Sequence, residues 1–99
     1  MEENIYRVKA GSAFLISDET RNSAYQLFTP DTGVTYDLVD PDGSEVVSGA
    51  SMSEGDTGEW TATAQSTVAW VLGMYTLITY AEHGGKISIK ENKNAFELF

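Results

Sequence analysis

Residues 70–86 read WVLGMYTLITYAEHGGK, a pattern that predicts one long strand followed by a tight reversal of the chain. Successive side chains of a strand point to opposite faces, so alternate residues share a face. One face carries Tyr75, Leu77, Thr79 and Ala81, and the other carries Met74, Thr76, Ile78 and Tyr80. Because both faces hold bulky groups, we expect a central strand that is covered on both sides, or on one side by a partner. The glycine pair at 84–85 predicts a hairpin.

The rest of the chain supplies strands that pair with this one. Residues 40–43 (DPDG) have a turn signature and join 34–40 to 44–48 as a predicted hairpin. Further strands are predicted at 5–17 (with a bulge or a switch between sheets at Gly11), 24–29, 59–64 and 86–90. The apolar tail 95–99 either ends the last strand or joins the sheet of a neighbouring subunit. About seven short strands predict an all-β fold, an antiparallel β-sandwich, with a small barrel as the alternative.

Length and composition point to one folded domain. The chain has 99 residues, of which 41% are hydrophobic and 11% aromatic, and this suits a single packed core. We expect one domain over residues 5–99, preceded by a disordered N-terminus at 1–4. Cysteine is absent, and residues 1–4 are acidic where a secretory signal would be basic, so we expect a small complete protein made in the cytoplasm. The apolar run 68–75 is too short to span a membrane.

The formal net charge of −9 is unevenly distributed along the chain. All six basic residues lie near the ends, at Arg7, Lys9, Arg21, Lys86, Lys90 and Lys93. Between Arg21 and Lys86 there is no lysine or arginine, and the acidic residues there argue against nucleic acid and against an anionic membrane as partners. A solvated acidic surface that keeps the protein soluble explains the charge without a partner. The sharper interpretation is an acidic middle and a basic edge that attract each other between copies.

Three motifs follow one another along the middle of the chain, at residues 40–43 (DPDG), 56–62 (DTGEWTA) and 72–77 (LGMYTL). Together they resemble the immunoglobulin-like and fibronectin-III-like sandwiches of bacterial and phage proteins, over residues 34–90. The resemblance implies a tyrosine corner at Tyr75, with Leu77 at the position that antibody domains give to cysteine. Small acidic sandwiches of this kind look like accessory virion proteins of tailed phages, which decorate the capsid or form the head–tail neck.

Few residues could carry chemistry. His83 is the single histidine and is predicted at a turn tip, so neither a catalytic triad nor a zinc site is expected. Gly84-Gly85-Lys86 lacks the rest of a phosphate-binding loop. The acids of the predicted turns match no EF-hand loop and are explained by turn chemistry, although calcium binding stays open. These acids are Asp40, Asp42, Glu54 and Asp56.

We therefore predict a non-enzymatic structural protein with no catalytic, cofactor or metal residues. Its expected partners are copies of itself and other virion proteins, and its expected location is a virion made in the cytoplasm of a bacterial host. The predicted interface consists of Trp70, Val71, Leu72, Phe96, Leu98, Phe99, Arg7, Lys9, Lys86 and Lys90, with the four basic residues sharing one side. The alternative is a carbohydrate- or cell-surface-binding module whose aromatic platform would use Trp60, Trp70, Tyr75 and Tyr80.

Overall fold

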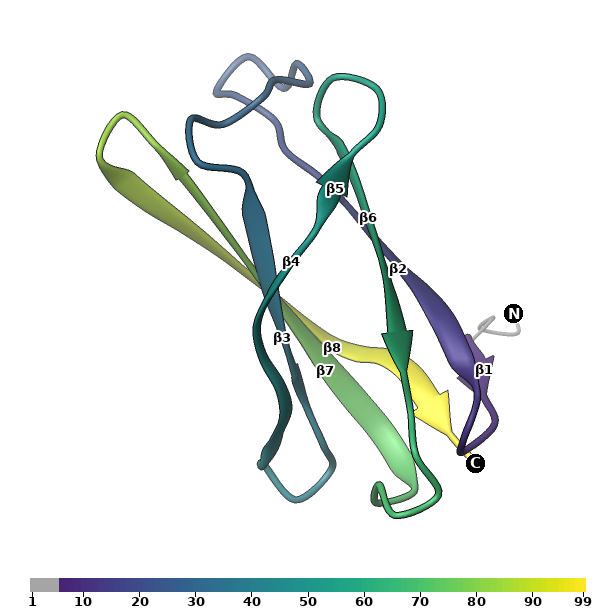
Figure 1. Cartoon of the computed structure of the whole chain (residues 1–99). Helices are drawn as coiled ribbons and strands as arrows, with labels where there is room; N and C mark the ends of the chain where they lie inside the picture. The colour runs from purple at the N-terminus through teal and green to yellow at the C-terminus, as the bar shows by residue number, and fades with distance from the viewer. Residues whose placement is uncertain (1–5) are drawn as a thin grey trace, which may run out of the picture.

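The computed structural model describes residues 6–99, in which all regular structure is strand (Figure 1). The strands are β1 (Arg7–Val8), β2 (Ala13–Glu19), β3 (Val34–Val39), β4 (Glu45–Ser51), β5 (Ser53–Glu54), β6 (Glu59–Gln65), β7 (Gly73–His83) and β8 (Lys86–Leu98). They form a five-stranded sheet, β1-β8-β7-β3-β4, and a three-stranded sheet, β2-β6-β5. The predicted all-β fold is confirmed, with two sheets. Residues 1–4, for which disorder was predicted, lie outside the described residues.

Strand β7 lies in the middle of the larger sheet, between β8 and β3, as the sequence predicts. Its inner face packs against the smaller sheet, and Tyr75, Leu77 and Thr79 are buried there. On its outer face, Ile78 and Tyr80 are only half-buried. The chain itself therefore covers the inner face of β7 over residues 75–79 and leaves the outer face partly exposed.

The turns explain why the strands follow this path. In the β3–β4 turn, Asp40 Oδ1 accepts hydrogen bonds of 2.9 Å from the backbone N–H groups of Asp42 and Ser44, and Gly43 has a φ of 89°. Only glycine adopts that backbone conformation easily, so the predicted hairpin is confirmed with its chemistry. Gly11, with a φ of 93°, lies where the chain leaves β1 in the larger sheet and enters β2 in the smaller one. It thus marks the predicted switch between sheets.

Two of the predicted strands differ from the structure. Residues 24–29 are not a strand, because Tyr25 takes a φ of 64° and the segment contributes only the isolated bridge between Arg21 and Leu27. The last strand does not stop near residue 90, because β8 continues to Leu98 through an irregularity opposite Tyr75 and Leu77. Asn94, with a φ of 62°, lies in this irregularity. The tail therefore ends the last strand of its own sheet.

The core lies between the two sheets and is rich in aromatic rings. Phe14 of β2 contacts Phe96 of β8 with ring centroids 4.6 Å apart, and Phe96 stacks on Tyr75 of β7 at 4.9 Å. Trp60 of β6 is buried and donates its indole N–H to Thr20 Oγ1 at 3.1 Å. Of these contacts, Phe14–Phe96 joins the two sheets, whereas Phe96–Tyr75 lies within the larger sheet and Trp60 bonds the residue that follows β2 in the smaller one.

Candidate interaction surfaces

The loop between β6 and β7 presents an apolar surface at one end of the sandwich. Val68, Val71 and Leu72 are 83%, 39% and 59% exposed, respectively. Trp70 is half-buried, and its ring stacks on Tyr75 with centroids 5.7 Å apart. Exposed apolar side chains that lie next to one another mark contact surfaces in soluble proteins. We call residues 68–72 the apolar loop.

Tyr75 fixes the shape of the apolar loop from inside the core. Its hydroxyl donates a hydrogen bond of 2.8 Å to the carbonyl of Val71, four residues earlier in the chain. Burial raises the pKa of Tyr75 to about 12, and the nearby carboxylates Asp40 and Asp42 add to the shift. The hydroxyl therefore keeps its proton across the physiological range and remains a donor. The loop is held by a buried side chain, which favours a preorganised surface over a loose one.

The C-terminal residues divide between core and surface. Phe96 and Leu98 are 3% and 1% exposed and belong to the core, so they do not form the exposed contact surface that was predicted for them. The alternation of β8 explains this, because every second side chain there turns towards the smaller sheet. Phe99 is 46% exposed, and the guanidinium carbon of Arg7 lies 4.2 Å from the centre of its ring.

The four basic residues of the predicted interface do not share one side. β1 and β8 are neighbours, but they pair only at Arg7–Glu97 and Val8–Leu98. Arg7 and Lys9 therefore lie at one end of β8, whereas Lys86 lies at the other end. Lys90 turns towards the smaller sheet, where its Nζ donates to Asp18 Oδ1 at 3.0 Å and to the carbonyl of Glu19. The basic edge is thus split by the length of the strand.

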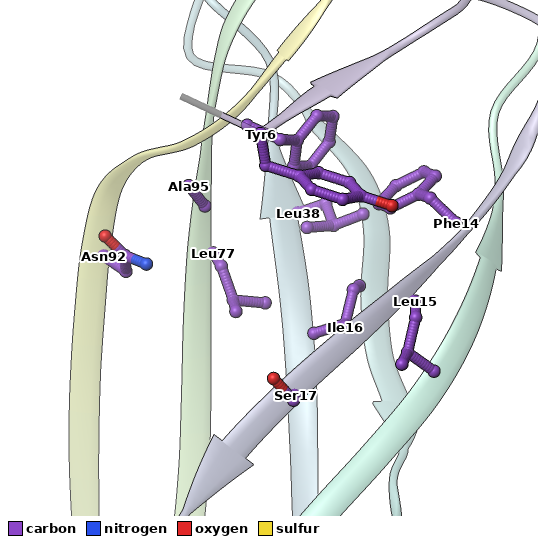
Figure 2. A pocket seen from close by; sticks show the side chains of 10 residues that line it. Tyr6, Phe14, Leu15, Ile16, Ser17, Leu38, Leu77, Asn92 and Ala95 are labelled. Atoms are coloured by element: carbon purple, nitrogen blue, oxygen red, sulfur yellow. The ribbon is translucent and has the colours of Figure 1, made fainter. Parts of the chain in front are cut away.

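A groove opens at the side of the sandwich, between β2 and β8 (Figure 2). Its volume is about 430 Å³, and most of its lining is apolar. The buried side chains of Phe14, Ile16, Leu38, Leu77 and Phe96 form its floor, and the exposed Tyr6 and Leu15 lie at its mouth. Sequence reasoning missed this groove. Its one signal was the run at 14–16, where Leu15 puts an apolar side chain on the outward face of a predicted strand.

The polar side chains that the structure describes make mostly local contacts. Among residues 6–99 no group of three or more His, Asp or Glu side chains is placed to hold a metal ion. The exposed pair His83 and Asp31 lies 3.2 Å apart, with the ring of Phe28 against the imidazole. On the outer face of the larger sheet, the Tyr80 hydroxyl donates to Asp37 at 2.8 Å, and this bond raises the pKa of Tyr80. The described part of the chain also lacks a helix long and apolar enough to cross a bilayer.

The four aromatic residues of the alternative prediction do not form one platform. Trp60 and Tyr75 are buried in the core, and Tyr80 lies on the outer face of β7. Trp70 alone lies at the apolar loop, with one side of its ring covered by Tyr75. A sugar-stacking surface made of these residues would need them side by side and exposed.

Comparisons with family models, with curated proteins and with solved structures found no match for this chain.

Proposed function

We propose that this chain is an immunoglobulin-like sandwich that works as a non-enzymatic structural protein and assembles with copies of itself. The division of strands supports the fold class. β2, β5 and β6 form one sheet and β3, β4, β7 and β8 lie in the other, which is how variable-type immunoglobulin domains divide their strands B, D, E and C, C′, F, G. The hydrogen bond from Tyr75 to the carbonyl of Val71 has the form of a tyrosine corner.

The apolar loop is the observation that carries the assembly function. Val68, Val71 and Leu72 lie within five consecutive residues and are exposed, and the loop is held in place by Trp70 and Tyr75. Burying such side chains against a partner removes apolar area from water and contributes about 25 cal/mol per Å² before the costs of association. A preformed apolar surface at one end of a small domain suits a structural contact.

The proposed setting is the virion of a tailed phage, as a capsid decoration or head–tail neck component that contacts other virion proteins. This rests on the resemblance of the three motifs at 40–43, 56–62 and 72–77 to small sandwiches of phage proteins. The large negative charge favours protein partners over nucleic acid, because it repels the phosphate backbone.

Sedimentation velocity of the full chain tests the proposed assembly. The wild-type protein is expected to sediment faster as its concentration rises, and Leu72→Asp is expected to sediment more slowly than the wild type at the same concentration, because a charge replaces an exposed apolar contact. Tyr25→Asn is the matched control, since Tyr25 is also exposed but lies in the loop between β2 and β3, and asparagine accepts its positive φ. Wild-type protein that is monomeric at every concentration and ionic strength would refute self-assembly.

A further inference from the structure

Two strand edges are open on the same side of the molecule, one in each sheet. Within the described residues, β2 pairs only with β6, so its other edge has no neighbour. Among residues 6–99, β8 pairs with β1 only at Glu97 and Leu98, and its edge along residues 86–95 has no other strand of this described range beside it. Open edges present unpaired N–H and C=O groups and are templates for pairing with another strand. The apolar groove lies between these two edges (Figure 2).

The two edges run in opposite directions at matching heights. Lys90 of β8 contacts Asp18 of β2, and Phe96 of β8 contacts Phe14 of β2. Residue numbers therefore decrease along β8 in the direction in which they increase along β2, so the two strands are antiparallel. A two-fold axis parallel to the strands preserves both height and direction. Such an axis brings β8 of each copy beside β2 of the other in antiparallel orientation.

We propose that this open side binds a second copy of the chain through that two-fold axis, with β8 of each protomer pairing along β2 of its partner. The larger sheet of each protomer then continues into the smaller sheet of the other, so the dimer contains two such continuous sheets. The pairing satisfies the free backbone groups on four strand edges, two from each protomer. It also covers the mouth of the groove in each protomer, where Tyr6 and Leu15 are 54% and 60% exposed. An interface in which the same patch is used by both copies closes on itself.

The charges on the two edges favour pairing of β8 with β2 of the partner over pairing of β8 with β8 of the partner. The free edge of β8 carries Lys86, Lys90 and Lys93, and lysines on an edge deter pairing with the same edge of another copy. The edge of β2 ends in Asp18 and Glu19, at the height of Lys90. Within each chain Asp18 pairs with Lys90 and Glu19 with Arg21, so the partner's lysines add to existing ion pairs. The basic edge of one copy faces the acidic edge of the other.

Disulfide trapping in the full chain tests this dimer, because the wild-type sequence has no cysteine. The contact between Lys90 and Asp18 sets the height, so Glu91 of one copy is expected opposite Ser17 of the other; both are exposed. Ser17→Cys and Glu91→Cys are prepared separately, mixed and oxidised. The mixture is expected to give at least fivefold more disulfide-linked dimer than either variant alone, since a bridge needs Cα atoms about 4.4–6.8 Å apart.

Ser48→Cys is the matched control, because Ser48 is an exposed residue of β4 at the far edge of the larger sheet. Mixed with Ser17→Cys, it is expected to give only the background of the single variants. Dominant bridging of Glu91→Cys with itself would overturn the dimer in favour of a β8–β8 contact.

This dimer rests on the proposed function only in that copies associate, and it uses a different surface from the apolar loop. Absence of the mixed bridge in a protein that sediments as an oligomer would overturn the dimer and leave the proposed function standing. A mixed bridge in a protein in which Leu72→Asp changes nothing would support the dimer and count against the apolar loop.

Discussion

Tyr75 connects the centre of the core to the apolar loop. Its ring lies between Trp70 and Phe96, and its hydroxyl reaches the carbonyl of Val71. The side chain is fully buried, so its hydroxyl depends on this carbonyl for a hydrogen bond. One residue thus contributes both to packing between the sheets and to the position of an exposed surface.

Tyr75→Phe removes the hydroxyl and keeps the ring. We expect a loss of about 1–2 kcal/mol in the free energy of unfolding at pH 7, because the carbonyl of Val71 loses its partner. Urea denaturation measures this, with Tyr25→Phe as the control in an exposed ring. A loss below that of the control would show that water replaces the hydroxyl at no cost.

The same variant carries a pH signature. The pKa of Tyr75 rises from 10.0 to about 12 on folding, so the folded chain holds this proton more tightly than the unfolded chain. The stability due to the proton is complete below pH 10 and is lost as the pH rises towards 12. The wild type is therefore expected to lose stability more steeply than Tyr75→Phe over this range. Burial also raises the pKa of Tyr36, and the hydrogen bond to Asp37 raises that of Tyr80, so a smaller slope remains in the variant.

At the scale of elements, the turn before β6 holds the loop between β2 and β3 against the sandwich. Gly58 has a φ of 74°, its carbonyl accepts from Thr20 N–H at 2.9 Å, and its N–H donates to Glu54 at 2.8 Å. A Cβ at this position would lie 2.9 Å from both Phe28 N and Thr20 O, which are backbone atoms. Gly58 is therefore required both for its φ and for close approach.

Gly58→Ala and Gly43→Ala separate these two requirements. Gly43 also has a positive φ, of 89°, but a Cβ there meets no atom within 4 Å. We expect Gly43→Ala to lose about 1 kcal/mol from backbone strain, and Gly58→Ala to lose a further 1–3 kcal/mol because the added methyl displaces backbone. Thermal or urea unfolding of both variants gives the comparison. Equal losses would mean that the loop moves away without penalty.

Elements set by local chemistry were predictable from sequence, and those set by distant partners were not. The turn at 40–43 follows from Asp40 and Gly43 alone, and the central position of β7 follows from its two bulky faces. Residues 24–29 have strand-forming side chains, yet the hydrogen bonds that Asn22 makes with the backbone of Ala24 and Gln26 bend the chain there. The burial of Phe96 depends on the whole of β8, which passes through an irregularity that no local pattern announces.

The candidate surfaces divide in the same way. The exposed apolar loop was expected from Trp70, Val71 and Leu72, because these residues precede a strand and do not themselves alternate between apolar and polar side chains. The groove depends on β1 joining the larger sheet and leaving β2 without a second neighbour. That choice involves residues about 90 positions apart, as in the ion pair of Arg7 with Glu97, so no window of sequence contains it.

At the scale of the whole molecule, charge opposes compactness. A net charge of −9 on 99 residues repels itself in the folded state. The ion pairs in the described part of the chain are mostly exposed, as at Arg7–Glu97 and Lys93–Glu91, and exposed pairs contribute about 0–1 kcal/mol each. The destabilisation by repulsion between like charges is therefore expected to exceed the stabilisation that these ion pairs contribute.

Added salt is accordingly expected to stabilise the protein. The screening length falls from about 30 Å at 0.01 M to about 8 Å at 0.15 M, which weakens repulsion across the molecule more than contacts at ion-pair distance. The midpoint of thermal unfolding, measured at low protein concentration, should rise over this range. Sodium and potassium chloride should act equally, and a falling midpoint would show that the ion pairs outweigh the repulsion.

The burial of Phe96 and Leu98 affects how the protein is made. Both side chains fill the space between the sheets. The pairing of Arg7 and Val8 with Glu97 and Leu98 joins segments from opposite ends of the described chain. During translation, the first strand must wait until residue 98 has left the ribosomal exit tunnel. Until then the nascent polypeptide exposes its aromatic residues and its strand edges, so the interval before residue 98 emerges is when chaperones would be needed most.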